Sequence, residues 1–299
     1  MTPDAFSSPV VVCRPVLPSD KADVKEFCKF IWEGHDYIQY VWDEWLADPQ
    51  GILAIAEYVG HAVGLGKVTL LVPGQWWLEG LRVDPKFQGL KIGSHIHDYI
   101  DEWWLEHGDG VARLMTGSQR VQVQHLCEKL GYAKTGEVAG FLAPLLDEPT
   151  GAFQPLGENE IPEALQFAGS SPSLRLSNGL IDLGWRFVTP NLDTLQELVR
   201  NKLACWWRGR EGLLLSWEDK GETPEDERLL AIGLPACRME SLPEFLLDVR
   251  RLVAPLGYDN VFWIAPLSDE LAMVLNETGF ERKWENSAYL YEKRHPTRP

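Results

Sequence analysis

The chain has 299 residues and is acidic, because 28 lysines and arginines stand against 44 aspartates and glutamates, for a formal net charge of −16 at pH 7. Proteins that bind phosphate backbones need a basic surface, so this balance argues against nucleic acid as a partner. A hydrophobic fraction of 45% with interspersed charges is typical of a globular protein. The length exceeds what one hydrophobic core usually holds, and we expect two domains.

The N-terminus and the cysteines set further expectations. The first residues lack the basic start and long apolar run of a signal peptide, and no stretch reaches the uninterrupted apolar length of a membrane span. The five cysteines are widely spaced and odd in number, so they indicate neither a zinc knuckle nor a disulfide framework. These features predict a soluble, cytoplasmic protein with reduced thiols, no membrane partner and no bound metal.

The first half alternates segments typical of strands and helices. Strands are expected at 10–17, 51–58, 62–72, 76–83 and 111–116, and helices at 19–31, 37–46, 93–107 and 122–130. Gly131 fits the C-terminal cap of the last of these helices. Two prolines flank a stretch without periodicity at 144–155, which predicts a linker.

The end of the second half repeats the order of elements found in the first. The expected series is strand 228–234, helix 242–254, strand 261–265, helix 269–277 and strand 288–292. Gly279-Phe280 follows the late helix as Gly131-Tyr132 follows its counterpart. This order predicts a structural duplication, with domains at 1–147 and 148–299.

The segment 78–94 is the part of the sequence most informative about chemistry. It predicts a strand that enters a glycine-bearing loop, and the loop opens a helix. Unpaired amides and the positive dipole end of such a helix can hold a phosphate or pyrophosphate. Glycines at a turn also occur for geometry alone, so a purely structural loop is the alternative. A P-loop is excluded, because Gly66-Lys67 is followed by Val68 where Ser or Thr is needed.

This segment resembles motif A of the GNAT acetyltransferase superfamily, V-x-P-x-x-[RQ]-x-x-G-x-[GA]. Val83, Pro85, Gln88 and Gly93 are in register, and Lys91 stands where the first glycine is usual. The Lys91 ammonium either attracts a phosphate or crowds the space that a glycine leaves open. Amide donors survive any substitution except proline, so we expect binding to be retained.

A second segment, 119–132, is similar to the superfamily pattern N-x-x-A-x-x-L-Y-x-x-x-G-F. Leu126, Gly131 and Tyr132 match it, whereas Arg120 and Cys127 stand where Asn and Tyr are usual. The runs 36–37, 42–49 and 78–83 are similar to the subgroup that contains the vertebrate histidine N-acetyltransferase. That similarity implies transfer of an acetyl group from acetyl-CoA to the α-amino group of an amino acid, with histidine as one candidate.

The resemblance implies a set of site residues. Pyrophosphate would contact the amides of the loop, and the pantetheine arm and thioester oxygen would contact the backbone of the preceding strand. The implied cofactor contacts are Leu81, Arg82, Val83, Gln88, Gly89, Leu90, Lys91, Ile92, Gly93, Ser94 and Arg120.

Catalytic roles are implied for two side chains. Glu79 lies four residues before Val83, where many GNAT enzymes carry the general base; the alternative is a solvated strand carboxylate or a partner for Arg82. Cys127 stands where a tyrosine commonly acts as the acid, and the alternative is a small hydrophobe packed on a helix. His35 and Tyr37, near the break at Gly34, are nominated for the acceptor pocket.

These considerations predict two tandem α/β domains of GNAT type, each a mixed sheet flanked by helices. The second lacks a cofactor loop, because 235–241 contains no glycine, Pro235 removes a donor and Glu240 adds negative charge. The expected reaction is acetyl transfer to a small amine by a monomer or homodimer. The alternatives are a peptide or lysine acetyltransferase and a CoA-binding pseudoenzyme that senses a ligand.

Overall fold

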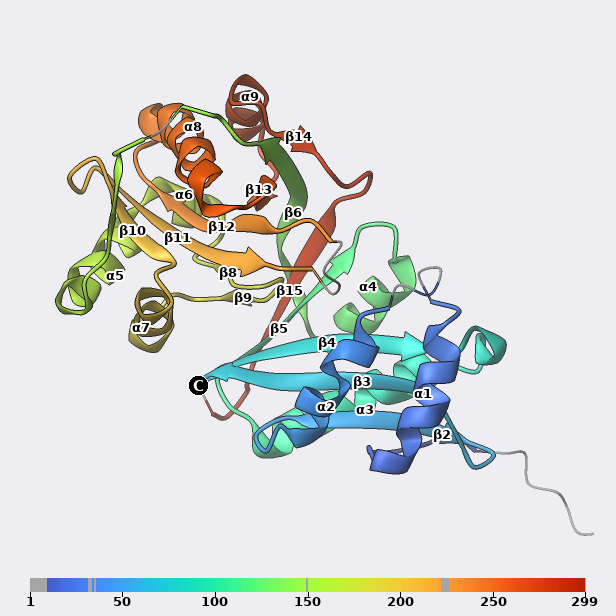
Figure 1. The fold of residues 1–299 in the computed structure, drawn as a ribbon. Coiled ribbons are helices and arrows are strands. Elements are labelled where there is room, and N and C mark those ends of the chain that lie inside the picture. Colours follow the sequence, from blue (N-terminus) through green and yellow to red (C-terminus); the bar gives the residue numbers. More distant parts are fainter. Residues whose placement is uncertain (1–9, 32–33, 35, 149, 222–225, 299) are drawn as a thin grey trace, which may run out of the picture. The chain divides into compact units, whose positions relative to one another are not determined.

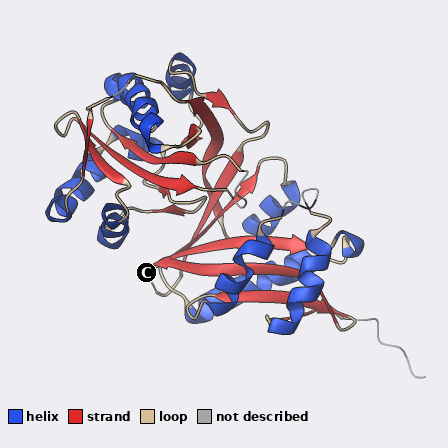
Figure 2. Cartoon of the chain, viewed as in Figure 1, coloured by secondary structure: helices blue, strands red, loops and turns tan. Residues whose placement is uncertain are grey.

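The structure is a computed structural model, and it describes residues 10–31, 34, 36–148, 150–221 and 226–298. The chain forms two compact units of helices and strands, each assembled from separate segments (Figure 2). Unit 1 contains the described residues up to Arg113, His125–Tyr132 and the described residues from Lys293 onward. Unit 2 contains Leu114–Gln124 and Ala133–Glu292, so the division runs through two strands and one helix.

Unit 1 is built on a sheet in the order β1-β2-β3-β4-β5 (Figure 1). Its strands are β1 (Val12–Pro15), β2 (Ile52–Tyr58), β3 (His61–Val72), β4 (Gln75–Val83) and β5 (Val111–Gly117). Neighbours are antiparallel except β4 and β5, which pair in parallel from Gln75–Trp77 to Val111–Arg113. The sequence predicted each of these strands to within a few residues.

Helices cover both faces of this sheet. They are α1 (Lys21–Cys28), α2 (Ile38–Ala47), α3 (Ile92–His107) and α4 (Val121–Lys129), the last shared between the units. On one face α1 and α2 bury Phe27 and Trp42 against Leu65 of β3. On the other face α3 lies close to β3, because a Cβ at Gly66 would come within 2.8 Å of Ile96 and Ile100. The glycines of β3 therefore allow α3 to pack closely against the sheet. The first turn of α3 follows β4 in the chain.

The end of the chain is held along α3. The Nζ of Lys293 lies 2.6 Å from a carboxylate oxygen of Asp101. His295 donates through Nε2 to the carbonyl of Leu105 at 3.0 Å, because its Nδ1 already accepts from the backbone of residues 297 and 298. Arg298 donates to the carbonyl of Glu106 at 2.9 Å. Unit 1 therefore depends on residues from the far end of the sequence.

Unit 2 has a sheet in the order β15-β6-β13-β12-β11-β10-β7. Its strands are β6 (Ala133–Pro144), β7 (Phe153–Pro155), β10 (Ala204–Trp207), β11 (Gly212–Asp219), β12 (Leu229–Ala236), β13 (Asn260–Pro266) and β15 (Ala288–Arg294), with β14 (Glu281–Arg282) paired to β6. Only β12 and β13 among these pairs run parallel, from Leu229–Ile232 to Asn260–Trp263. The predicted series at 228–292 is confirmed.

Helices α8 (Leu242–Leu252) and α9 (Asp269–Glu277) enclose the main core of unit 2, around Phe245 and Trp263. Helices α5 (Ile161–Ser170), α6 (Pro172–Leu176) and α7 (Leu192–Arg200) contact β10, β11 and β12, together with the hairpin of β8 (Ile181–Asp182) and β9 (Phe187–Val188). Short 3₁₀ turns lie at Pro18–Asp20, Pro85–Phe87, Glu158–Glu160, Met239–Ser241 and Ala254–Leu256.

Each compact unit contains segments from both halves of the sequence. Strand β6, from the first half, pairs with β13 as well as β15, and residues 293–298 group with unit 1. The division into domains at 147 and 148 stays a prediction; a cut there would separate β6 from β13. The end of the predicted linker forms β7.

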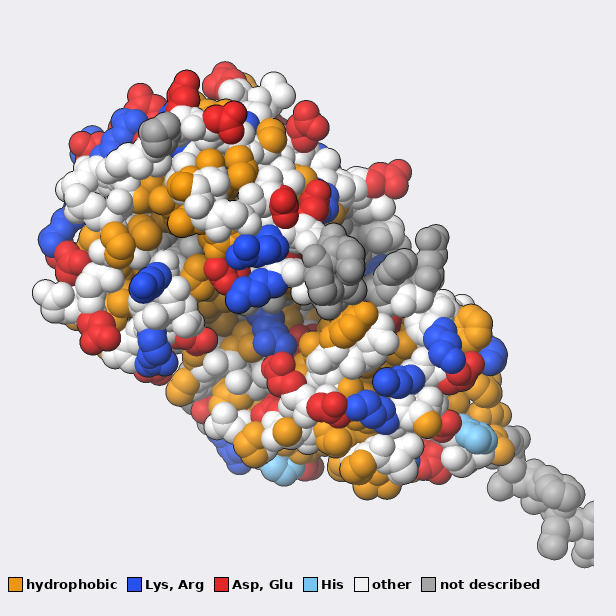
Figure 3. All heavy atoms as spheres, in the orientation of Figure 1, with side chains coloured by type: hydrophobic (Ala, Val, Ile, Leu, Met, Phe, Trp, Pro, Cys, Tyr) orange, Lys and Arg blue, Asp and Glu red, His pale blue; other side chains and the backbone are white. Residues whose placement is uncertain are grey.

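The mixed charges on the surface and the free cysteines agree with what the composition predicts. On the face in Figure 3, acidic and basic side chains are mixed rather than gathered by sign. All five cysteines are free. No helix in the described part of the chain is long and apolar enough to cross a membrane.

Candidate active site

The loop between β4 and α3 is fixed at its start by Asp84. The Asp84 amide donates to the carbonyl of Val63 at 2.8 Å, and its carboxylate accepts from the amide of Lys86 at 2.9 Å. These bonds tie the end of β4 to β3 and start the 3₁₀ turn at Pro85–Phe87. The chain therefore leaves the sheet in a defined direction before the glycine-bearing part of the loop.

The loop enters α3 through two residues of left-handed conformation. Gly89 has φ of +87° and Lys91, the N-cap residue of α3, has φ of +58°. The amide of His95 donates to the carbonyl of Lys91 at 3.1 Å, which is the first turn of α3. The amides just before His95 precede the first intrahelical bond, so they point out of the N-terminal end of α3. Such an end is suited to a phosphate or pyrophosphate.

The left-handed conformation of Lys91 explains why motif A usually has glycine at this position. A left-handed backbone costs a non-glycine residue about 1–2 kcal/mol, and glycine avoids most of that cost. The Lys91 side chain is exposed, so it occupies no space inside the loop. At Gly93 a Cβ would lie 3.7 Å from Val83, an ordinary contact, which agrees with a motif that accepts glycine or alanine at this position.

Strand β4 contains a bulge between the predicted base and the predicted thioester contacts. Glu79 pairs with Lys67 and Arg82 pairs with Leu65, so Gly80 and Leu81 together face one residue of β3. Gly80 has φ of +69°, and a Cβ there would lie 2.6 Å from the Trp45 ring. Only glycine fits this position without displacing α2.

Glu79 is half-buried and accepts a hydrogen bond from the hydroxyl of Thr69 on β3 at 2.8 Å. Directly across from it, Lys67 has a buried side chain that contacts the carboxylate of Asp48 and donates to the carbonyl of Val68 at 2.8 Å. Gly51 provides the space, because a Cβ there would lie 2.5 Å from the Lys67 Nζ. The predicted base therefore sits on a rigid part of the sheet.

A second cluster joins Arg82 to the connection between α1 and α2. The Arg82 Nε donates to Asp36 at 2.8 Å, and the guanidinium lies 5.3 Å from the centre of the Tyr37 ring. Asp36 is buried and also lines a pocket of about 270 Å³ beside α1 and α2, with Cys28 and Trp42. Arg82 and Tyr37, both predicted site residues, are thus brought together. His35 lies outside the described residues.

Cys127 has no exposed surface, and burial raises the pKa of its thiol to about 12. Its carbonyl accepts from the amide of Tyr132 at 2.9 Å, which closes α4 at Gly131. Of the two interpretations of Cys127, the packed small hydrophobe fits this environment.

Arg120 belongs to unit 2, unlike the loop, and it starts α4. Its carbonyl accepts from the amides of Val123 and Gln124 at 3.0 and 3.2 Å.

The matching connection in unit 2 is short. Between β12 and α8 it consists of residues 237–241, in which Cys237 is buried and Met239–Ser241 form a 3₁₀ turn. Glu240 lies in that turn and Pro243 in the first turn of α8. Within the described residues, no group of three or more His, Cys, Asp or Glu side chains is placed to hold a metal ion.

Sequence reasoning missed the neighbours that hold the predicted residues. Thr69 and Lys67 come from β3, and the register of β3 against β4 brings them to Glu79, whereas Asp48, after α2, contacts Lys67. Asp36 entered the sequence analysis solely as part of a resemblance, and a lone carboxylate before a helix gives no sign of its partner.

Comparisons with known proteins agree with this geometry. Residues 22–132 match the model of the Acetyltransferase (GNAT) family. No curated protein matches the sequence.

Solved structures with the same fold share little sequence with this chain. A GCN5-related N-acetyltransferase from Sphaerobacter thermophilus has a TM-score of 0.62 at 16% identity, over 97% of this chain and 96% of that one. A tandem GNAT protein from the clavulanic acid biosynthesis pathway has a TM-score of 0.59 at 10% identity, over 97% and 100%. A GCN5-related N-acetyltransferase from Kribbella flavida has a TM-score of 0.54 at 14% identity, over 95% and 72%. Residues 22–132 therefore resemble the GNAT acetyltransferase family, and the chain as a whole has the fold of a tandem GNAT protein.

Proposed function

We propose that this protein transfers the acetyl group of acetyl-CoA to the amino group of a small molecule, with free amino acids such as histidine among the candidates. The observation that carries this proposal is the N-terminal end of α3, whose amides follow the left-handed Lys91 immediately after the bulged end of β4. The subgroup similarity at 36–37, 42–49 and 78–83 supports an amino acid as acceptor.

In this proposal the loop binds the nucleotide end of acetyl-CoA. The amides of residues 88–94 hold the pyrophosphate, and the dipole of α3 favours its negative charge. The backbone of Leu81 and Val83 contacts the pantetheine arm and the thioester oxygen. Because these contacts come from the backbone, the replacement of the usual glycine by Lys91 leaves them intact.

The reaction then needs a proton to leave the amine and another to reach the thiolate. Glu79 takes a proton from the ammonium, directly or through a water. The neutral nitrogen attacks the thioester carbonyl, an N–C bond forms, the nitrogen loses its second proton to solvent, the C–S bond breaks, and the CoA thiolate leaves. The buried Cys127 is poorly placed to supply the last proton, so we assign that proton to solvent.

A small acceptor is favoured over a peptide by the pocket that Asp36 borders. Its volume of about 270 Å³ is near the low end of small-molecule sites. Asp36 lines this pocket and pairs with Arg82 beside the Tyr37 ring, so it connects the pocket to the end of β4.

The direct test measures CoA thiol release by the full chain with acetyl-CoA, over the twenty amino acids, common amines and a set of peptides with free N-termini. We expect turnover with one class of small amine. Turnover only with peptides would replace the small acceptor by a peptide. Binding of acetyl-CoA without release of thiol for any acceptor would make the protein a CoA-binding sensor.

A further inference from the structure

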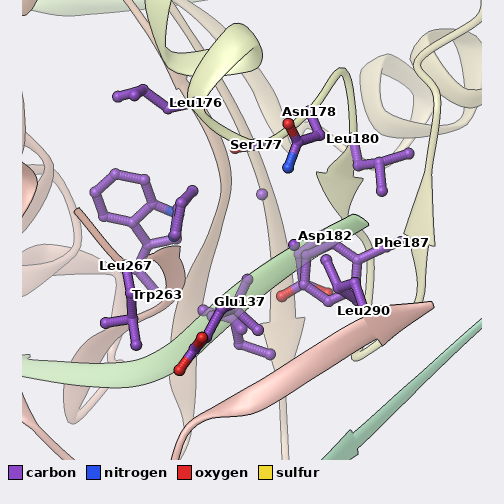
Figure 4. Close-up of a pocket in the computed structure, with 15 residues that line it drawn as sticks. Glu137, Leu176, Ser177, Asn178, Leu180, Asp182, Phe187, Trp263, Leu267 and Leu290 are labelled. Carbon is purple, nitrogen blue, oxygen red and sulfur yellow. The ribbon is translucent and has the colours of Figure 1, made fainter. Parts of the chain in front are cut away.

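Unit 2 contains a cavity of about 110 Å³ where β12 and β13 cease to pair (Figure 4). Residues of β6, β12, β13 and β15 and of the connection from α6 to β9 line it. The apolar part of its walls is made by Leu176, Leu180, Phe187, Trp263, Leu267 and Leu290. The polar groups in the lining include Ser177, Asn178 and two carboxyl groups, and none of the lining residues is basic.

One of these carboxyl groups, Asp182, is buried and has no cationic partner in the described part of the chain. Its two oxygens accept from the amide of Trp185 at 2.9 Å and from the indole nitrogen of Trp217 at 3.2 Å, which are both neutral donors. Burial, with a smaller effect of Asp219, raises the pKa of Asp182 to about 8. Buried carboxylates are normally paired with a cation, so this one lacks its usual complement among the described residues.

The second carboxyl group, Glu137, is already compensated. It accepts from the hydroxyl of Ser287 at 2.6 Å and from the Nζ of Lys134 at 3.0 Å. Figure 4 shows its carboxylate directed away from Asp182. Asp182 is therefore the acid in this lining whose charged form a bound cation would stabilise.

The fold holds Asp182 in place through the backbone. It lies at the end of β8, paired to Phe187 of β9, and the amide of Leu183 donates to the carbonyl of Arg186 at 2.9 Å. The Asp182 carbonyl approaches Gly233 of β12 so closely that a Cβ there would lie 2.5 Å away. The carboxyl group is thus preorganised, which lowers the cost of binding.

We propose that this cavity binds a small organic ammonium ion, with Asp182 as its counter-ion and the leucine and aromatic walls around its alkyl body. A carboxylate has about four acceptor positions, and the two neutral donors leave room for an ammonium. The volume has room for several waters, which a small ligand would displace. This site lies wholly within unit 2 and does not depend on the proposed acetyl transfer.

The test is isothermal titration of the full chain with three probes that share one alkyl body and differ in charge: n-butylammonium, 1-butanol and butyrate. We expect saturable binding of butylammonium and binding at least tenfold weaker for the other two. Asp182→Asn should remove this binding. Glu79→Gln, in unit 1, should leave it unchanged, which separates the cavity from the proposed acceptor site.

A second variant keeps the test decisive if Asp182→Asn fails to fold. Gly136 lines the cavity on β6, where a Cβ would lie 3.3 Å from Asn178 and 3.5 Å from Leu290. Gly136→Val should therefore narrow the cavity and weaken butylammonium binding at least tenfold without touching Asp182. Equal binding of butanol and butylammonium, or butylammonium binding that survives both variants, would overturn the proposal and leave Asp182 as a protonated structural residue.

Discussion

The connections from β4 to α3 and from β12 to α8 occupy the same place in the order of elements of the two units, yet they differ in what they present to a ligand. The first spans residues 84–91 and contains Gly89 and Lys91 in left-handed conformation. The second spans 237–241, has no residue of positive φ, and carries Glu240. Pro243 removes one amide from the first turn of α8 and Glu240 adds negative charge before it, so we expect a pyrophosphate to bind in unit 1 rather than unit 2.

The strands on which these connections stand are much more alike. Each has a glycine at a bulge, Gly80 in β4 and Gly233 in β12, next to a short parallel pairing. What approaches that glycine differs: the Trp45 ring in unit 1 and the Asp182 carbonyl in unit 2. If both proposals hold, similar strand frames serve ligands of opposite charge, because the loops and helix ends set the charge of the site.

The number of CoA molecules bound per chain tests the difference between the two units most directly. Titration of the full chain with CoA should give one equivalent per chain, in unit 1. Ser94→Glu should remove measurable binding, because it puts negative charge beside the amides of α3. The matched change Glu244→Ser, in the first turn of α8, should leave binding unaltered. Two equivalents of CoA on the wild-type chain would contradict the assignment of one site.

The next largest expected effect is the loss of stability when the contacts between α3 and the end of the chain are removed. Lys293→Ala should lower the free energy of unfolding by about 3 kcal/mol, because it leaves the carboxylate of Asp101 unpaired in a buried position. Urea denaturation of the full chain measures this. Arg210→Ala, which breaks exposed pairs with Glu160 and Glu163 in unit 2, is the control and should cost about 1 kcal/mol or less. Equal losses for the two variants would show that residues 293–298 do not support α3.

The proposed base is tested by Glu79→Gln. Turnover near neutral pH should fall about a hundredfold or more, a typical general-base contribution, while the affinity for acetyl-CoA stays nearly unchanged. The measurement compares steady-state thiol release with CoA titration on the same preparations. Unaltered turnover together with an unaltered pH profile would make Glu79 structural, and the proton would leave by another route.

Much of the strand and helix order followed from the sequence, because hydrophobic periodicity and turn residues are local signals. The strands on either side of Gly60 were predicted, as was the closure of α4 at Gly131. The exchange of β6 and residues 293–298 between the units was not, because pairing partners are not encoded in periodicity. Residues 156–227 received no prediction, although they contain α5 to β11.

Some features of the candidate site were likewise predicted from the sequence and others were not. The loop at 83–94 was found from a motif whose glycine and proline positions reflect backbone geometry. The left-handed conformation of Lys91 and the bond from Thr69 to Glu79 were not, since both depend on the neighbours of the residue in space. Asp182 left one local sign, a lone acid in the apolar run 180–183, but its cavity depends on strands distant in the sequence.

Thr69 provides a further test of the proposed base, because we expect Thr69 to position the carboxylate of Glu79. Thr69→Val removes the hydroxyl that donates to Glu79, and kcat should fall about tenfold, equivalent to the roughly 1.4 kcal/mol of one hydrogen bond to a charged group. The KM for acetyl-CoA should not change. Thr69→Ser retains the donor and should restore most of kcat, whereas a role in packing alone would leave valine, close in shape to threonine, as active as the wild type.

The smallest effect concerns Lys91, where unit 1 departs from the motif. Lys91→Gly should raise the free energy of unfolding by about 0.5–1 kcal/mol, because relief of the left-handed strain of about 1–2 kcal/mol exceeds the added entropy of glycine in the unfolded chain. Lys86→Gly, in the same loop but without a positive φ, should lower it instead. Urea denaturation gives both values, and CoA titration should show affinities within about threefold of the wild type, since a tenfold change would need about 1.4 kcal/mol and the amides of α3 are unaltered. A CoA affinity that falls tenfold in Lys91→Gly would mean that the Lys91 ammonium itself holds a phosphate, and the loop would then bind by side-chain charge as well as by its backbone.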